Sequence, residues 1–326
     1  MYELFFGLSR NPFSMTADPG MLYITTQHRE ALAALSYGIT ARKGMMALTG
    51  EAGTGKTSLL MRLTTHLHNG NIRSSIILNP HLSAGEMLEM IMTDFGLADA
   101  GKGKAKLLQG LQQFLLENFR GGRICLLIVD EAHRLSADLL EELRLLGNFE
   151  TPRQKLLQIV LCGQPELASL LNTASMRQVK QRISLRARLL PLSGAEVATY
   201  VDFRWSRSAQ SKAPFSAEAL AVVAEASSGI PRLINALCDN ALITAFAERS
   251  RIITPAHVAQ AAMDLDLSRE GIDDKPCLPS NGEGGTAKSS APSFCGLSTP
   301  ENHRNATSFL TRFRHGKGSA VAEIRK

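Results

Sequence analysis

The chain has 326 residues, of which 44% are hydrophobic and 20% are charged, and its formal net charge is +6. This composition describes an ordinary globular protein with one large domain or two modest ones. No apolar run reaches the length of a membrane span, and residues 1–6 carry an early acid and no basic segment, so we expect no signal peptide. The modest positive charge suits nucleic acid or an acidic membrane surface and does not decide between them.

The five cysteines are odd in number and scattered along the chain. Cys125 and Cys162 fall in apolar strand-like runs and Cys238 in a helical one, with neither disulfide nor zinc-site spacing. We therefore expect three buried thiols in a reducing compartment. The predicted location is the cytoplasm, or the periphery of the inner membrane through partners.

Strands and helices alternate between residue 28 and residue 190. Hydrophobic periodicity predicts helices over residues 28–42, 58–69, 104–120 and 136–149, and strands over 44–50, 74–79, 124–129, 156–162 and 184–190. The stretch from Ser83 to Glu86 is a capping box that opens a further helix. Because the run 124–129 is apolar throughout, it is typical of the middle of a parallel sheet. The prediction is a doubly wound α/β domain with helices on both faces of a parallel sheet.

After Pro191 the pattern changes to helices alone. They are predicted over residues 193–208, 216–227 and 231–248, followed by a short helix that begins at Thr254-Pro255. The stretch from Ser193 to Glu196 is a second capping box. From about residue 267 the chain is rich in Gly, Ser and Pro and then basic, which predicts a disordered tail over residues 267–326.

The strongest functional signal is a phosphate-binding P-loop with the sequence Gly50-Glu51-Ala52-Gly53-Thr54-Gly55-Lys56-Thr57. A short apolar strand precedes it and an amphipathic helix begins at Ser58, which is the context that the pattern requires. Its glycines let backbone N–H groups turn toward phosphates, and the N-terminus of the helix adds positive potential. We expect residues 50–58 to bind ATP, with Lys56 on the β and γ phosphates and Thr57 on Mg²⁺.

An acidic pair, Asp130-Glu131, directly follows the apolar strand 124–129. A carboxylate at the end of such a strand lies beside the P-loop at the carboxyl edge of the sheet. Asp130 is expected to support the Mg²⁺ shell, and Glu131 to polarise the attacking water as a general base. Two solvated acids in a turn are the alternative. Together with the P-loop, the pair predicts a Mg²⁺-dependent ATPase.

The same acids begin the sequence Asp130-Glu131-Ala132-His133, which also spells the box of DEAH helicases. Such helicases carry a Ser-Ala-Thr motif after the next strand and a second α/β domain. Here the next strand ends in Cys162-Gly163-Gln164-Pro165, and the part that follows is helical. We therefore interpret His133 as a residue at the approach to a helix and not as a helicase coupling element.

Several short stretches carry a resemblance to a known family. They are Phe6-Gly7-Leu8, Asn11-Pro12-Phe13, Asp18-Pro19, His28-Arg29-Glu30-Ala31-Leu32, the P-loop, Asp130 to His133, Gly163-Gln164-Pro165-Glu166-Leu167, Gln181-Arg182-Ile183 and Gly229-Ile230-Pro231-Arg232-Leu233-Ile234-Asn235. In this order and spacing the chain resembles the AAA+ ATPases and, more closely, the general secretion pathway protein A (ExeA/GspA) family of bacteria over residues 1–265. The resemblance implies an AAA+ ATPase domain with the family's N-terminal segment over residues 1–190 and a helical lid domain over residues 191–266.

The resemblance also implies three further catalytic residues. Gln164 looks like the sensor 1 residue, which places the attacking water or reads the γ-phosphate, and Arg232 looks like sensor 2, which reaches from the lid to the nucleotide. Arg182 resembles an arginine finger that acts on the ATP of a neighbouring subunit, an effect worth roughly 10³ to 10⁵ in rate. Assembly would then switch hydrolysis on.

Each of these roles has an alternative. Gln164 could cap the helix that follows it, and Arg232 could be an ordinary surface residue. The finger could be a neighbour of Arg182, or the whole basic run could be a solvated face or bind DNA phosphates. The other basic residues of this run are Arg177, Lys180, Arg186 and Arg188.

The family's N-terminal segment corresponds to Phe5 to Tyr23 here. We expect it to pack partly beside the nucleotide and partly as core filler, and we suggest Tyr37, Gly38 and Ile39 as an adenine sandwich. Full-length members of the secretion branch continue into a membrane span and a peptidoglycan-binding domain. Neither is expected here, so cell-wall anchoring does not carry over from the resemblance.

Two functions follow from the resemblance. The first is an ATPase that assembles as a ring or filament and couples its ATP state to assembly or remodelling of a secretion or envelope system through an unidentified protein partner. The alternative is an ATP-dependent, DNA-bound regulator of transposition or a related process, because the two groups share fold and site. A nucleotide-gated binding module with negligible turnover is a third hypothesis, against which the intact Glu131 argues.

Overall fold

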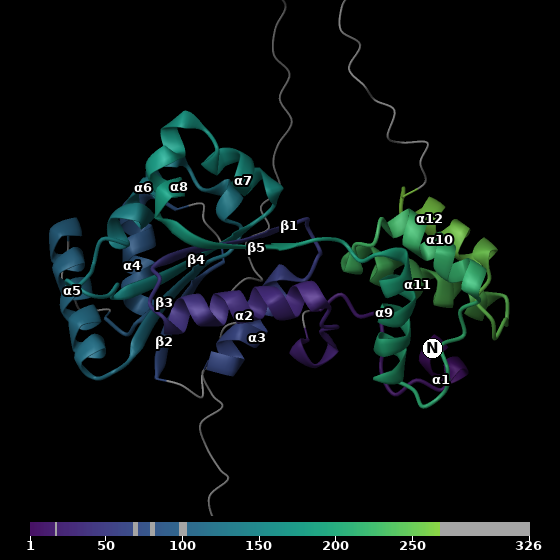
Figure 1. Ribbon diagram of the computed structural model, residues 1–326. Coiled ribbons are helices and arrows are strands. Elements are labelled where there is room, and N and C mark those ends of the chain that lie inside the picture. Colours follow the sequence, from purple (N-terminus) through teal and green to yellow (C-terminus); the bar gives the residue numbers. More distant parts are fainter. Residues whose placement is uncertain (17, 68–70, 79–81, 98–102, 268–326) are drawn as a thin grey trace, which may run out of the picture. The chain divides into compact units, whose positions relative to one another are not determined.

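A parallel sheet carries the P-loop in the computed structural model, which describes residues 1–16, 18–67, 71–78, 82–97 and 103–267 (Figure 1). Its five strands lie in the order β2-β3-β4-β1-β5, and the paired strands run parallel. The strands are β1 (Met45–Gly50), β2 (Ile72–Ile77), β3 (Ile124–Val129), β4 (Leu157–Gly163) and β5 (Ile183–Leu189). The predicted parallel sheet is confirmed.

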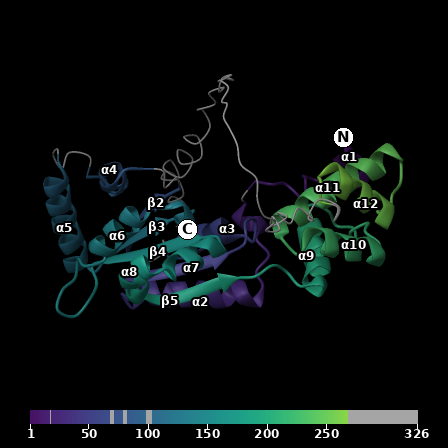
Figure 2. The ribbon, with the colours of Figure 1, turned by 90° about the horizontal axis from the view of Figure 1, so that it is seen from above.

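Helices cover both faces of this sheet. On one face lie α2 (Thr26–Thr40) and α3 (Lys56–Leu67), and on the other lie α6 (Ala137–Leu146), α7 (Pro165–Leu171) and α8 (Arg177–Arg182) (Figure 1). Beside β2 lie α4 (Ala84–Asp94) and α5 (Lys104–Arg120), whereas α2 contacts β5 (Figure 2). Short 3₁₀ helices complete the connections at Pro19–Met21 (η1), Ala132–Arg134 (η2) and Ala174–Met176 (η3).

The two faces of the sheet bury separate apolar cores. Leu48 and Val160 belong to the core beneath α2 and α3, while Ile159 and Leu161 belong to the core beneath α4 to α8. Successive side chains of a strand point to opposite faces. A strand covered on both sides is therefore largely apolar, which is why β3 has no polar side chain and β4 has one, Gln158, whose amide oxygen accepts from the backbone N–H of Gly44 at 2.8 Å.

The helical part that follows β5 has a core of its own. Its helices are α9 (Gly194–Ser206), α10 (Ala217–Ser227), α11 (Pro231–Ala247) and α12 (Pro255–Asp264). The N-terminal segment adds the short helix α1 (Tyr2–Phe6) to this core. Phe6 stacks edge-on against Trp205 with ring centroids 6.2 Å apart, and Phe13 meets Phe215 at 6.0 Å. The first half of the segment is therefore part of this core, in agreement with the prediction that the segment serves partly as core filler.

Local sequence signals predicted most helix ends. Both capping boxes are present, with Ser83 paired to Glu86 and Ser193 paired to Glu196. The bounds of α5 and β3 are those predicted, whereas no bounds were predicted for α1, α7 and α8, although a helix was expected to follow Gln164. These three helices have 5, 7 and 6 residues, too few turns for a periodic pattern to be visible.

The described residues all belong to one compact unit. The domain boundary near residue 190 therefore stays a prediction, and the predicted disordered tail lies, from residue 268, outside the described residues. Cys125, Cys162 and Cys238 are free and buried, as predicted. In the described ranges, every helix is too short or too polar to cross a membrane.

Candidate active site

The loop between β1 and α3 depends on two glycines for its shape. Gly53 and Gly55 have φ angles of 81° and 94°, in the left-handed region that glycine adopts without penalty. A Cβ at Gly53 would also lie 2.6 Å from the Cβ of Arg232, so a side chain there would clash. The backbone of Arg232 contacts the loop as well, because its N–H donates to the carbonyl of Gly53 at 3.3 Å.

Lys56 places a buried positive charge at the start of α3. The residue is only 5% exposed. The Nζ donates to the carbonyl oxygens of Gly50 at 2.8 Å and of Glu51 at 2.9 Å. These acceptors are neutral, so the ammonium and the helix N-terminus together create positive potential at the loop. Such a loop is suited to bind phosphate.

Asp130 connects the end of β3 to the P-loop helix. The hydroxyl of Thr57 donates to one carboxylate oxygen at 2.9 Å, and the backbone N–H of Glu131 donates to the other at 2.9 Å. The thiol of Cys162, at the end of β4, also hydrogen-bonds to Asp130, and burial raises the pKa of this thiol well above its usual range. Asp130 is 5% exposed, and these three hydrogen bonds fix the position of its carboxylate.

The oxygen atoms of Thr57 and Asp130 fit a Mg²⁺ ion. Mg²⁺ takes one or two protein oxygens and completes its shell with waters and substrate phosphates. Within the described ranges, no group of three or more His, Cys, Asp and Glu side chains is arranged to hold a metal ion. An ion at this point would therefore rely on phosphate and water oxygens for most of its ligands.

Glu131, the second acid, has an unusual backbone conformation. Its φ is 53°, in the left-handed region, which costs a non-glycine residue about 1–2 kcal/mol. The turn aims its carboxylate at two side chains of η2: the Nε2 of His133 lies 3.6 Å away and the Nε of Arg134 lies 3.9 Å away. His133 in turn contacts Gln164, the residue after β4.

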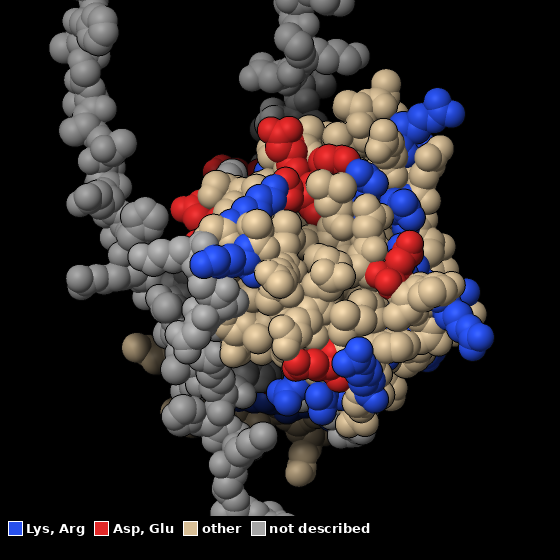
Figure 3. All heavy atoms as spheres, turned by 90° about the vertical axis from the view of Figure 1, so that its left-hand side faces the viewer, with Lys and Arg blue, Asp and Glu red and all other residues tan. Residues whose placement is uncertain are grey.

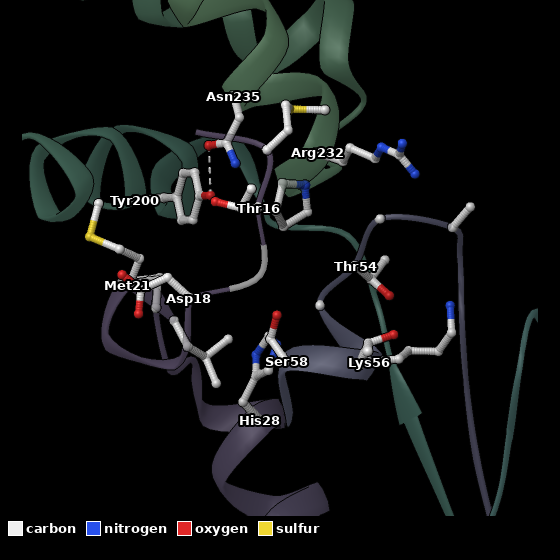
Figure 4. A pocket seen from close by; sticks show the side chains of 18 of the residues that line it. Thr16, Asp18, Met21, His28, Thr54, Lys56, Ser58, Tyr200, Arg232 and Asn235 are labelled. Atoms are coloured by element: carbon white, nitrogen blue, oxygen red, sulfur yellow. Dashed lines mark hydrogen bonds between the residues drawn. The ribbon is translucent and has the colours of Figure 1, made fainter. Parts of the chain in front are cut away.

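Residues 52–58 of the P-loop, together with Glu131, Arg134 and Gln164, line a cavity of about 660 Å³, whereas the predicted Gly50, Glu51 and Asp130 lie outside its lining. This volume is within the range of small-molecule sites in proteins. Lys56, Thr54 and Arg232 lie at one end of the cavity, and Met21 and Tyr200 at the other (Figure 4). The predicted residues in its lining are Ala52, Gly53, Thr54, Gly55, Lys56, Thr57, Ser58, Glu131, Gln164 and Arg232. The structure thus brings both loop motifs, the residue after β4 and the helical part to one cavity.

More than half of the lining comes from residues to which no individual role was assigned from sequence, seven of them in the N-terminal segment and seven elsewhere. They are Ser14, Met15, Thr16, Asp18, Met21, Leu22, Tyr23, His28, Arg134, Leu192, Tyr200, Arg204, Pro231 and Asn235. The second half of the N-terminal segment therefore lines the same cavity as the P-loop, in agreement with the prediction that part of the segment packs beside the nucleotide site. Tyr200 and Arg204 carried no sequence signal, because a helical pattern does not show which residues face a cavity.

Arg204 fastens the N-terminal segment to α9. It is 6% exposed, and its guanidinium donates to three backbone carbonyls, those of Pro12 at 2.6 Å, Ser14 at 2.9 Å and Met21 at 3.4 Å. Next to it, the hydroxyl of Tyr200 donates to the Oδ1 of Asn235 at 2.8 Å. These bonds hold the far wall of the cavity in place.

His28 lies between the segment and the P-loop. Its Nδ1 lies 2.7 Å from the hydroxyl of Thr25, the N-cap residue of α2. Burial lowers the pKa of His28, and the carbonyl of Thr54 and the charge of Glu196 oppose this shift. The imidazole therefore favours its neutral form.

Two sets of predicted residues lie elsewhere. Ile39 is fully buried under the sheet, and a Cβ at Gly38 would lie 2.4 Å from the Sδ of Met46. Tyr37 is 58% exposed, and none of the three lines the cavity. The suggested adenine sandwich is wrong, because the inner face of α2 is used for packing on β1 and β5.

Arg182 also lies outside the cavity lining. It is the last residue of α8, is exposed, and precedes β5. The first residue of β5, Ile183, pairs with Met45 at the start of β1, whereas the P-loop follows Gly50 at the other end. Arg182 and the P-loop are thus separated by the length of a strand.

A parallel sheet in the order β2-β3-β4-β1-β5, with a P-loop after β1 and an acidic pair after β3, is typical of P-loop ATPases of the AAA class. Residues 39–171 match the family model described as AAA domain. The chain is 42% identical over 271 residues to general secretion pathway protein A of Aeromonas hydrophila, covering 83% of this chain and 49% of that protein. The fold, the P-loop and these two matches support an AAA ATPase that is similar to general secretion pathway protein A.

Other relatives share parts of this pattern. The ATP-dependent target DNA activator B of Escherichia phage Mu is 28% identical over 229 residues, covering 69% of this chain and 67% of that protein. The ORC2 protein of Aeropyrum pernix superposes with a TM-score of 0.58 at 17% identity, over 79% of this chain and 73% of that chain. The RuvB branch migration motor of Thermotoga maritima reaches 0.51 at 18% identity, over 77% and 73%. These two structures support the fold alone, and the chain spans about half the length of the secretion relative.

Proposed function

We propose that the chain binds ATP with Mg²⁺ in this cavity and hydrolyses it, and that its ATP state controls self-assembly and the assembly or remodelling of a secretion or envelope system. The observation that carries the ATP part is that Lys56, Thr57 and Glu131 line one cavity of about 660 Å³, with Asp130 hydrogen-bonded to Thr57 beside it. The cellular part rests on the relative from the general secretion pathway.

Binding follows from the loop and α3. The backbone N–H groups of residues 50–58 and the helix N-terminus would hold the phosphates. Lys56 would exchange its bonds to the carbonyls of Gly50 and Glu51 for bonds to the β and γ phosphates, which are stronger because both partners are charged. Thr57 and Asp130 would hold Mg²⁺, which neutralises charge on the phosphates.

Hydrolysis needs a base and groups that sense the γ-phosphate. Glu131 would accept the proton of the attacking water. Gln164, at the end of the neighbouring strand, would place that water, as sensor 1 does in the related ATPases. Arg232, at the cavity rim and bonded through its backbone to Gly53, would act as sensor 2.

Arg182 would act on the ATP of a neighbouring subunit. At about 3.3 Å per residue, the six residues of β1 separate it from its own P-loop by roughly 20 Å. An arginine side chain spans only about a third of that distance, so it would not contact its own nucleotide. An exposed arginine at this end of the sheet is available to a second copy of the chain, which supports assembly as a homo-oligomer.

A DNA-bound regulator is the second candidate function. It is supported by the similarity to a phage protein whose name states that it is an ATP-dependent target DNA activator. The edge strand β5 also exposes Arg186 and Arg188. The face drawn in Figure 3, in contrast, intersperses acidic and basic side chains among uncharged ones and presents no continuous basic surface among its described residues.

The deciding experiment is ATP hydrolysis against protein concentration, with and without duplex DNA, at low and moderate salt. A steep rise with concentration that is indifferent to DNA supports the self-assembling envelope ATPase. A rate that rises only with DNA and falls with salt supports the second candidate, since phosphate contacts release counterions. Binding of ATP without turnover at any concentration would overturn both in favour of a binding module.

A further inference from the structure

We propose that His133 is a positioning residue that couples Gln164 to Glu131, so that contact of Gln164 with the γ-phosphate sets the position of the catalytic base. This inference rests on the proposed function and adds to it a residue that neither motif pattern assigns. The observation behind it is that one imidazole ring touches both side chains, which belong to the ends of two neighbouring strands.

The ring is fixed on one side by the backbone. The N–H of Gln164 donates to the Nδ1 of His133 at 3.3 Å. Because Nδ1 accepts this bond, the proton of a neutral ring sits on Nε2. The Nε2 lies 3.1 Å from the side-chain amide nitrogen of Gln164, which is also a donor, and 3.6 Å from the carboxylate of Glu131. A turn of this amide by 180° presents its oxygen to the N–H of His133, which then has one acceptor on each side, the amide oxygen of Gln164 and the carboxylate of Glu131.

The fold places this ring with little freedom. η2 packs against β4 and α7, and a Cβ at Gly163 would lie 3.1 Å from the backbone nitrogen of His133. The missing side chain at Gly163 therefore lets η2 approach the strand end. The His133 side chain is 11% exposed, whereas that of Glu131 is 35% exposed. The ring is the constrained member of the pair and the carboxylate is the one with room to move.

Glu131 is held in a state that can change. Its left-handed backbone turns the carboxylate toward His133 and toward Arg134, whose Nε is 3.9 Å away. Both contacts are long for hydrogen bonds. A movement of the Gln164 amide toward a phosphate would shift the N–H of His133 from the amide to the carboxylate. Contact of Gln164 with the nucleotide would then change the position of the Glu131 carboxylate through the imidazole ring of His133.

A double-mutant cycle on the full chain tests this coupling. The variants are His133→Ala, Gln164→Ala and the two combined, with His133→Gln as the conservative change and exposed His66→Ala on α3 as the matched control. Steady-state hydrolysis gives kcat and KM, a fluorescent ATP analogue gives the affinity, and thermal melting reports folding. If His133→Ala fails to fold, His133→Phe retains the ring volume and removes the nitrogens.

We expect His133→Ala to lower kcat by about tenfold or more while KM and affinity change less than about twofold, because the contact acts on the base and not on the phosphates. The kcat of the combined variant should be at least about half that of the slower single variant, since the effects of two coupled residues do not add. His133→Gln should recover much of the rate, because an amide can also bridge the two groups.

Multiplied losses in the combined variant, or an unchanged kcat in His133→Ala, would overturn the coupling. Loss of kcat in His133→Gln equal to that in His133→Ala would also contradict it, because hydrogen bonding would then not be the relevant property. Absence of hydrolysis in the wild-type chain would instead overturn the proposed function. If Glu131→Gln does not hydrolyse ATP while His133→Ala hydrolyses it at the wild-type rate, the proposed function stands and only this inference is overturned.

Discussion

The hydroxyl of Thr57 donates to the carboxylate of Asp130 at 2.9 Å, across 73 residues of sequence. This bond joins the first turn of α3 to the end of β3. It places the P-loop and the acidic pair in one site before any ligand is considered. The predictions below test the separate parts of that site.

Removal of the P-loop lysine should strongly weaken nucleotide binding. In Lys56→Ala the only change near the phosphates is the loss of a buried ammonium, which is worth about 3 kcal/mol or roughly a 100-fold weaker Kd. Titration of a fluorescent ATP analogue measures it. Lys106→Ala, on the exposed face of α5, is the control and should bind as the wild type does. Normal affinity in Lys56→Ala would refute the P-loop assignment.

Glu131→Gln should bind ATP and turn it over slowly. The amide keeps the shape of the side chain and cannot accept the proton of water, so kcat should fall by about 10² to 10⁴. Hydrolysis at saturating ATP, with gel filtration to detect a trapped assembly, measures the effect. Exposed Glu89→Gln on α4 is the control. A variant that hydrolyses ATP at the wild-type rate would show that another group is the base.

Arg182→Ala should keep ATP affinity and lose hydrolysis by roughly 10³ or more. If the finger acts on a neighbour, mixing this variant with Lys56→Ala subunits should restore part of the rate, because each lacks what the other supplies. Arg177→Ala, at the other end of α8, is the matched control. Mixed assemblies without any gain in rate would argue against a finger that acts between subunits, and a loss in Arg177→Ala instead would move the role to that residue.

Arg204→Leu should destabilise the protein by about 3 kcal/mol, because three backbone carbonyls lose a charged donor inside the fold. The segment that these carbonyls belong to lines the cavity, so ATP affinity should fall as well. Thermal melting and nucleotide titration measure the two effects. Exposed Arg207→Leu, one turn further, is the control. Equal melting temperatures for both variants would contradict the fastening role.

Stability should fall as the pH drops below neutral, in part through His28. Burial lowers the pKa of this imidazole below its ordinary value of 6.5. The unfolded chain therefore takes up a proton near that pH, while the native protein does so only at lower pH. Between the two pKa values the unfolded state binds more protons, so the free energy of unfolding rises with pH. The slope of melting temperature from about pH 5.5 to 7.5 should be smaller in His28→Asn than in exposed His66→Asn. Equal slopes would assign the effect to other groups.

Much of the fold could be predicted because its signals are local. The glycines of the P-loop, the capping boxes at Ser83 and Ser193, and the uninterrupted apolar run of β3 each act within a few residues. The sequence alone thereby determined the parallel sheet, the P-loop and the acid after β3, since a strand end and a loop end at the same sheet edge must meet.

The tertiary structure decided which other residues join them. Tyr200, Arg204 and Asn235 reach the cavity only because α9 and α11 pack with one particular rotation, which depends on the shapes of the residues buried between them. The same packing turned Ile39 away from the site and into the core under the sheet. The contact of His133 with both Glu131 and Gln164 likewise requires two strand ends and a 3₁₀ turn to be placed to within an ångström. A spacing in sequence specifies which strands carry these residues, and only the packed fold sets that distance.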